Sequence, residues 1–213
     1  TRTHQYLDDN PTNPASYKYN ISATVRDDDG GDLLVSDAFG HVIRRYSGVT
    51  GSSLDVFASG GGLTVPTSLA KGPDGNLYVA DSAANQILRF DGNSGAFLGT
   101  FASVASGTIA VWPTFGPDCN LYVSVRHQTG FDTIERFNGT TGASLGTFAV
   151  LDVTGLAFDI RFGPDGKLYV SELQSGLSRY DGTTGAFIDT FIPTGTAGMG
   201  AAVGGFDFGS DGN

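Results

Sequence analysis

The sequence predicts an all-β protein, a β-propeller built of four-stranded blades, and three observations lead to this prediction. Glycine and proline, which disfavour helix interiors, supply 32 and 8 of the 213 residues. No segment shows the apolar period of a helix. Similar segments recur at steps of 44, 44, 47 and 46 residues, a period typical of a propeller blade. The equivalent positions are Asp32, Asn76, Asn120, Lys167 and Asn213.

The second unit shows the expected elements most clearly. Two turn sequences, Pro73-Asp-Gly75 and Asp91-Gly-Asn-Ser-Gly95, separate short runs rich in aromatic and β-branched residues. Each reversal has a physical basis, because proline presets φ, aspartate caps the turn and glycine accepts positive φ. The four strands of this unit are expected at residues 66–71, 77–80, 86–90 and 96–101.

The same pattern divides the rest of the chain. Residues 1–16 are expected to form an N-terminal arm, and residues 17–213 the propeller. The blades are placed at about residues 17–57, 66–101, 112–148 and 157–191, with the innermost strand of a fifth at 204–213.

The units carry a family resemblance. The stretch from Phe162 to Ser171, followed by that from Leu177 to Phe187, resembles the NHL-type and streptogramin-lyase-like β-propeller repeat of secreted bacterial proteins. The stretch from Asp37 to Tyr46 is similar to the motif that names the NHL repeat, with His41 at the histidine position. The resemblance covers about residues 17–213 and implies a fold rather than an activity. The metal and histidine sites of lactonases and lyases that share the fold have no residue-by-residue match here.

Four blades and one strand do not make a familiar ring, because six or seven units of this period need about 270 to 315 residues. Three interpretations stay open. The chain is a fragment of a larger secreted propeller, or another copy completes it through the N-terminal arm to give an oligomer or fibre. Alternatively, four blades close alone with the arm as a latch.

Charge and composition exclude several functions. The net charge of −10 argues against nucleic-acid binding, which needs a basic face. No apolar run approaches the length of a membrane helix. The single cysteine, Cys119, excludes an intramolecular disulfide framework. Cys119 also stands where the second and fourth units have glycine, so its turn is expected to take another shape.

An acidic run offers the one candidate metal site. Asp27, Asp29 and Asp32 lie within a run of carboxylates, which are ligands that calcium prefers. The same run occupies the position of the Gly-Pro-Asp-Gly turn in other units, so an acidic turn without metal is the competing interpretation. No other cofactor is predicted.

Repeated charges suggest pairing within blades. Arginines hold one position in each third strand, and acidic residues end most second strands, so surface ion pairs between them are expected. A ring of arginines that binds an acidic ligand is the functional alternative. The residues concerned are Arg45, Arg89, Arg136 and Arg179, with Asp37, Asp81 and Glu172.

An irregular loop in the third unit gives the candidate ligand site. This loop is longer than its equivalents and carries Arg126, His127 and Asp132, which are able to bind a ligand or exchange protons. Asn20 and Asn138 begin glycosylation sequons.

Together these features predict a secreted or cell-surface, non-catalytic module for binding or scaffolding. Its expected partners are a protein, a glycan or further copies of itself. The alternatives are a self-assembling surface fibre subunit and a lactonase- or lyase-like enzyme with a central metal site.

Overall fold

The computed structural model describes residues 31–151, 157–200 and 204–209, and within them it is an all-β protein. Fifteen strands and one 3-10 helix, η1 (Thr196–Gly198), make up these regions. The strands are β1 (Leu33–Asp37), β2 (Val42–Tyr46), β3 (Ser53–Ser59), β4 (Pro66–Lys71), β5 (Leu77–Asp81), β6 (Gln86–Phe90), β7 (Phe97–Ser103), β8 (Thr108–Phe115), β9 (Leu121–His127), β10 (Thr133–Phe137), β11 (Ser144–Val150), β12 (Ala157–Phe162), β13 (Leu168–Glu172), β14 (Gly176–Tyr180) and β15 (Phe187–Pro193).

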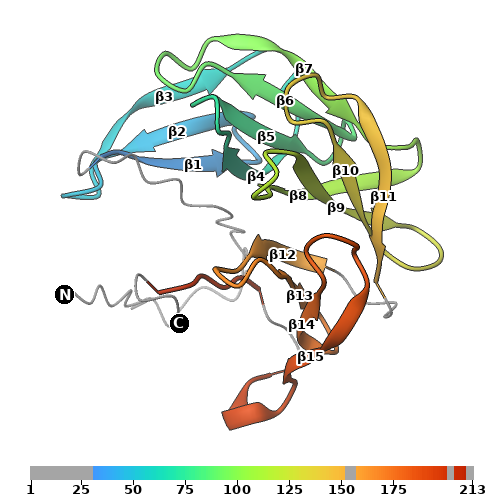
Figure 1. The fold of residues 1–213 in the computed structure, drawn as a ribbon. Coiled ribbons are helices and arrows are strands. Elements are labelled where there is room, and N and C mark those ends of the chain that lie inside the picture. Colours follow the sequence, from blue (N-terminus) through green and yellow to red (C-terminus); the bar gives the residue numbers. More distant parts are fainter. Residues whose placement is uncertain (1–30, 152–156, 201–203, 210–213) are drawn as a thin grey trace.

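The strands form four antiparallel sheets in which sequence neighbours pair: β1–β3, β4–β7, β8–β11 and β12–β15. The first has three strands within the described residues, and the others have four. Figure 1 shows the sheets following one another around a common centre, and β8 contacts both β4 and β12. This arrangement confirms the predicted all-β propeller. Among the described strands, no pairing joins the first sheet to the fourth.

Several predicted features lie outside the described residues. They are the N-terminal arm, the beginning of the first blade, Asn20, Asp27 and Asp29. Of the predicted fifth innermost strand, residues 204–209 are described, and they form no strand. Its assignment therefore stays a prediction.

The turn that contains Cys119 has the same shape as its glycine equivalents, so the prediction of a different turn was wrong. Cys119 adopts φ 60°, against 79° for Gly75 and 75° for Gly166. In each turn the backbone N–H of this residue donates to the carbonyl three positions earlier at 2.9 Å. The hydrogen bond and the flanking ladder thus hold a non-glycine residue in a left-handed conformation that costs about 1 kcal/mol.

A glycine in the later turn of the second, third and fourth blades fixes how closely the sheets approach. A Cβ built on Gly95 would lie 1.8 Å from the carbonyl oxygen of Phe57, which belongs to the preceding sheet. Gly142 meets Phe101 in the same way, and Gly185 meets Phe148. Only glycine allows this contact, so the repeated glycine positions each turn against the preceding outer strand.

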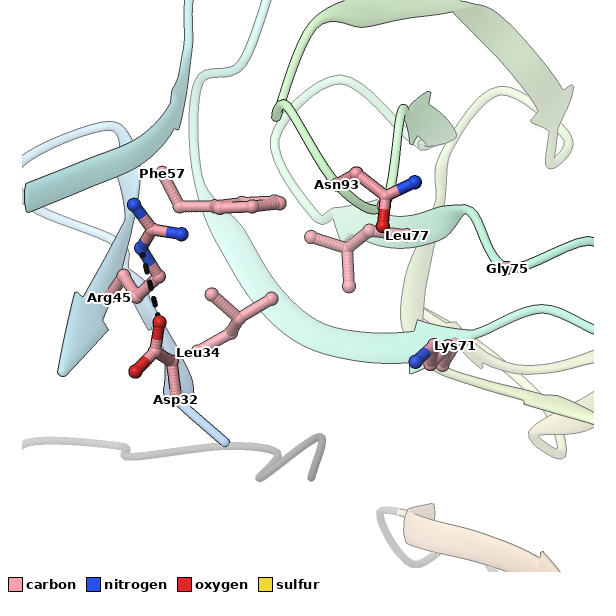
Figure 2. Close-up of a pocket in the computed structure, with 9 residues that line it drawn as sticks. Asp32, Leu34, Arg45, Phe57, Lys71, Gly75, Leu77 and Asn93 are labelled. Carbon is pink, nitrogen blue, oxygen red and sulfur yellow. Dashed lines mark ion pairs between the residues drawn. The ribbon is translucent and has the colours of Figure 1, made fainter. Parts of the chain in front are cut away.

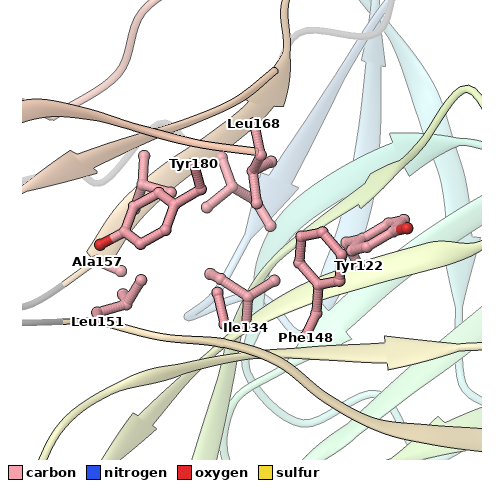
Figure 3. Packing of buried hydrophobic residues seen from close by; sticks show 10 residues of the cluster. Tyr122, Ile134, Phe148, Leu151, Ala157, Leu168 and Tyr180 are labelled. Atoms are coloured by element: carbon pink, nitrogen blue, oxygen red, sulfur yellow. The ribbon is translucent and has the colours of Figure 1, made fainter. Parts of the chain in front are cut away.

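Aromatic rings fill the space between sheets. Tyr78 of β5 lies edge-on between Phe101 and Phe115, with ring centroids 4.8 Å apart in both pairs. Tyr122 lies in the same way between Phe148 and Phe162, at 4.8 and 4.9 Å. We call this arrangement the ring sandwich. Figure 3 shows the packing of Tyr122 and Phe148 beside Leu168 and Tyr180 of the fourth sheet.

The segment 204–209 continues this packing although it forms no strand. Tyr169 of β13 packs between Phe191 and Phe208, with centroid distances of 5.7 and 5.0 Å. Phe208 therefore takes the place that Phe115 and Phe162 take in the preceding sandwiches. No helix in the described residues is long and apolar enough to cross a membrane.

Candidate functional site

Acidic residues at the ends of the second strands hold the neighbouring loops in place. Asp81 is fully buried, and its carboxylate accepts hydrogen bonds from Thr64 and from the backbone N–H of Val65 at 3.0 Å. Asp37 accepts from the Gly40 N–H and from Arg44, both at 2.7 Å. These two donors lower the pKa of Asp37 below its usual value. Asp81 thus orders the chain that leads into the second sheet, and Asp37 orders the turn between β1 and β2.

The predicted site of the third blade is only partly assembled. Asp132 is buried, and its Oδ1 accepts the backbone N–H of His127 at 2.9 Å. Its Oδ2 accepts the Ala157 N–H at 3.4 Å, which ties the loop to the next sheet. The imidazole Nε2 of His127 instead lies 3.1 Å from the Thr133 hydroxyl. The Asp132 carboxylate therefore contacts the backbone of His127 and not its imidazole. This contact orders the loop.

Arg126 takes no part in that contact. It lies in β9 beside Ile109 of β8, and its Nε is buried with no hydrogen-bond partner among the described residues. The structure therefore links Asp132 with His127 and leaves the predicted role of Arg126 in ligand binding untested.

The remaining predicted sites are the calcium site, of which only Asp32 is described, and the glycosylation site at Asn138. Asp32 lies 3.6 Å from the Arg45 guanidinium, measured from Oδ2 to Nε. No cluster of three metal-ligating side chains occurs in the part of the chain that the structure describes. Asn138 caps its turn, because its Oδ1 accepts the N–H groups of Thr140 and Thr141 at 3.0 and 2.9 Å. Calcium binding and glycosylation thus stay predictions.

The predicted pairing of arginines with second-strand acids was wrong. Arg45 pairs with Asp55 and Arg179 with Asp189, and both acids lie on outermost strands. Arg44, rather than Arg45, pairs with Asp37. The reason is the register, which places each repeated arginine opposite residue 55, 99, 146 or 189 of the outer strand.

The arginines also pack on the phenylalanines of the outer strands. Each guanidinium lies over a phenylalanine ring of its outer strand, 4.3 to 5.8 Å from the centroid. In the second and third sheets, glycine stands where the first and fourth have aspartate. The repeated arginine is therefore part of the scaffold in every blade.

Asp159 is a functional candidate that the sequence analysis missed. It lies on β12 and is 1 % exposed, and burial raises its pKa to about 6 although Arg161 opposes this shift. Its Oδ2 accepts from Arg161 at 3.2 Å and from the Phe206 N–H at 3.3 Å. Its Oδ1 has no partner among the described residues. Asp159 thus fixes residues 204–209 and is able to exchange a proton near pH 6.

A pocket with a charged lining lies between the first and second sheets. Its volume is about 150 Å³, and Phe57, Leu34 and Leu77 form the apolar part. Figure 2 shows these three side chains grouped around the space, with the Arg45–Asp32 ion pair on one side and Lys71 on the other. Asn93 and the backbone of Gly75 and Gly92 complete the lining. Sequence reasoning missed this pocket, although Leu34 stands where the later units have tyrosine.

Comparison with known proteins shows the fold. No protein-family model and no curated protein matches the sequence. Virginiamycin B lyase from Staphylococcus aureus is 18% identical, with 92% of this chain and 62% of that chain covered and a TM-score of 0.64. Hydrazine synthase from Kuenenia stuttgartiensis is 16% identical, with 87% and 52% covered and a TM-score of 0.62.

A structure of a nidogen/laminin complex is also similar, at 16% identity, with 73% of this chain and 58% of that chain covered and a TM-score of 0.59. The chain thus spans between half and two thirds of the length of these structures. At these identities the likeness establishes a β-propeller repeat architecture and leaves activity open.

Proposed function

We propose that this protein is an extracellular, non-catalytic propeller module that binds a ligand or partner on a rigid scaffold. The main supporting observation is that two buried carboxylates in the loops between sheets, those of Asp81 and Asp132, serve as structural acceptors. Asp81 and Asp132 are buried and accept backbone N–H groups of the chain that leads into a sheet. Because their lone pairs already hold the loops, we assign these carboxylates to the scaffold.

The architecture supports a binding role. Repeated arginines, ring sandwiches and turn glycines form the same contacts in successive sheets. Regular contacts of this kind stabilise a scaffold, whereas a binding site requires a place where the repeat departs from its pattern. The pocket at Leu34 and Lys71 is such a place.

Replacement of the buried carboxylates tests the proposal against a catalytic role. Asp81→Asn keeps the shape of the side chain but replaces one acceptor oxygen with a donor, so a buried N–H loses its partner. We expect the free energy of unfolding to fall by about 3 kcal/mol, measured by urea denaturation at pH 7. Asp132→Asn is expected to act in the same direction.

The matched control is Asp91→Asn. Asp91 caps an exposed turn, where Asn138 of the next blade performs the same capping, so little change is expected. A carboxylate retained for catalysis often lowers stability, and its replacement then leaves stability unchanged or raises it. That result for Asp81 and Asp132 would contradict the scaffold assignment and favour an enzyme.

A further inference from the structure

We infer that the pocket between the first and second sheets binds a small aromatic carboxylate, with the ring on Phe57 and the carboxylate at Lys71. The inference rests on the proposed binding function and adds the chemical class of the ligand. It depends on one comparison within the chain, between this interface and the interfaces that follow it.

The pocket exists because two aromatic residues of the repeat are replaced. The strand registers make Leu34 equivalent to Tyr78, since they pair with Arg45 and Arg89 respectively. They also make Lys71 equivalent to Phe115, since they pair with Leu77 and Leu121. The first interface therefore keeps one wall of the ring sandwich, Phe57, but lacks the central ring and the opposite wall.

The vacated space has the size of a six-membered ring. A cavity of about 150 Å³ is large enough for a benzene ring. The volume here is about 150 Å³, and Phe57, Leu34 and Leu77 form the apolar part of a lining that also includes charged and polar side chains. A ligand ring is expected to lie where the ring of Tyr78 lies in the next interface, 4.8 Å from its phenylalanine neighbours. Edge-on packing against Phe57 then contributes about 1 kcal/mol beyond burial.

The charges at the pocket specify the polar group of the ligand. Arg45 is already engaged by Asp55 and Asp32. Lys71 has no ion pair within the described regions, and its ammonium group is thus available to a carboxylate. The side-chain amide of Asn93 lines the same pocket and offers two further donors. An aromatic cation would meet Lys71 unfavourably and would find Asp32 already paired with Arg45. A sugar would gain less than an aromatic ring from contact with Phe57, Leu34 and Leu77.

Titration with benzoate, followed by NMR chemical shifts of the purified protein at pH 7, tests this inference. We expect saturable shifts with a Kd of about 1 mM, a reasonable value for so small a ligand. Lys71→Gln should weaken benzoate binding about tenfold while binding of phenol, which lacks the charge, changes little. Leu34→Tyr fills the ring position and should abolish binding of both compounds. Lys167→Gln removes a lysine that pairs with Asp165 outside the pocket, and this control should bind like the wild type.

Several results would overturn the inference. Benzoate shifts that persist in Leu34→Tyr would place binding elsewhere, and equal affinity in Lys71→Gln would remove the carboxylate from Lys71. Tighter binding of benzylamine or glucose than of benzoate would indicate another ligand class. Failure of benzoate to bind would contradict this ligand class but not the proposed function, which is tested separately by the stability of Asp81→Asn. The fold of each variant is checked from the dispersion of the same spectra.

Discussion

The first sheet meets the second without the ring sandwich that the later sheets share. In the later contacts a tyrosine lies between two phenylalanine rings, and Tyr78 and Tyr122 are almost completely buried. In the first contact Leu34 is half-buried, Lys71 is exposed and a cavity remains between them. The backbone pairing is the same in both places. Within these pairings the difference lies in the side chains, and a repeat position that fills the interface in later sheets borders a cavity in the first contact.

A third difference accompanies the replacements at Leu34 and Lys71, and it concerns the partner of the tyrosine hydroxyl. The hydroxyl groups of the sandwich tyrosines donate to the turn aspartates Asp74, Asp118 and Asp165 at 3.0 to 3.2 Å. The corresponding position of the first unit is Gly30 in the sequence. The first unit thus lacks the ring and the aspartate that would accept its hydroxyl, and the second unit lacks the aromatic neighbour at Lys71. A coordinated change of this kind favours a specialised interface over a single chance substitution.

The largest expected effect comes from removal of a central ring. Tyr122→Ala removes a buried side chain that contacts Phe148 and Phe162 and leaves a cavity between the third and fourth sheets. We expect the free energy of unfolding to fall by about 4 kcal/mol. Urea denaturation at pH 7 measures this change.

Leu34→Ala is the control for the first interface. Leu34 is half-buried beside an existing cavity, so we expect a loss of only about 1 kcal/mol. Equal losses for Leu34→Ala and Tyr122→Ala would show that the first interface is packed as tightly as the later ones.

The fold was predictable because its determinants are local. Proline, aspartate and glycine specify each turn, and alternation of apolar residues specifies the strands between them. The turn at Cys119 was predicted wrongly for the opposite reason. There, the ladder on both sides and the hydrogen bond to Gly116 outweigh the local preference of a non-glycine residue.

The sites were harder to predict because they depend on register between strands. The sequence aligns Arg45 with Arg89, but only the β-bulged pairing with the outer strand shows that Asp55 rather than Asp37 is the partner. Asp159 was missed because its contact with Phe206 joins residues more than 40 positions apart in the chain. The replacements at Leu34 and Lys71 were visible in the sequence, yet their proximity became clear only in the structure.

The contact between the fourth sheet and residues 204–209 includes a buried carboxylate, Asp159. The raised pKa of Asp159 predicts that stability depends on pH. Burial raises the pKa of Asp159 from 3.8 to about 6 in the folded protein. Its ionisation therefore opposes folding above pH 6, and this penalty disappears as the pH falls toward 4. Asp159→Asn should stabilise the protein by about 2 kcal/mol at pH 7 relative to its effect at pH 4.

The measurement compares urea denaturation of the wild type and Asp159→Asn between pH 4 and 7. Other carboxylates, such as Asp37 with its lowered pKa, change stability in the opposite direction but equally in both proteins. A difference between the two proteins that is constant with pH would show that Asp159 titrates at its ordinary value, and that Arg161 fully compensates its burial.

The smallest expected effect comes from building a ring sandwich into the first interface. Leu34→Tyr with Lys71→Phe supplies the two missing rings next to Phe57, and new aromatic contacts contribute about 1 kcal/mol beyond burial. We expect the double variant to be about 1 kcal/mol more stable than the wild type, because no aspartate at position 30 accepts the new hydroxyl. Each single variant should gain less than half of this, since each ring needs the other, and a double-mutant cycle in urea measures that coupling.

Additive effects, or a loss in the double variant, would show that the first interface has a backbone spacing unsuited to the sandwich. A gain in stability joined to loss of benzoate binding would instead show that the cavity is retained for binding at the expense of packing.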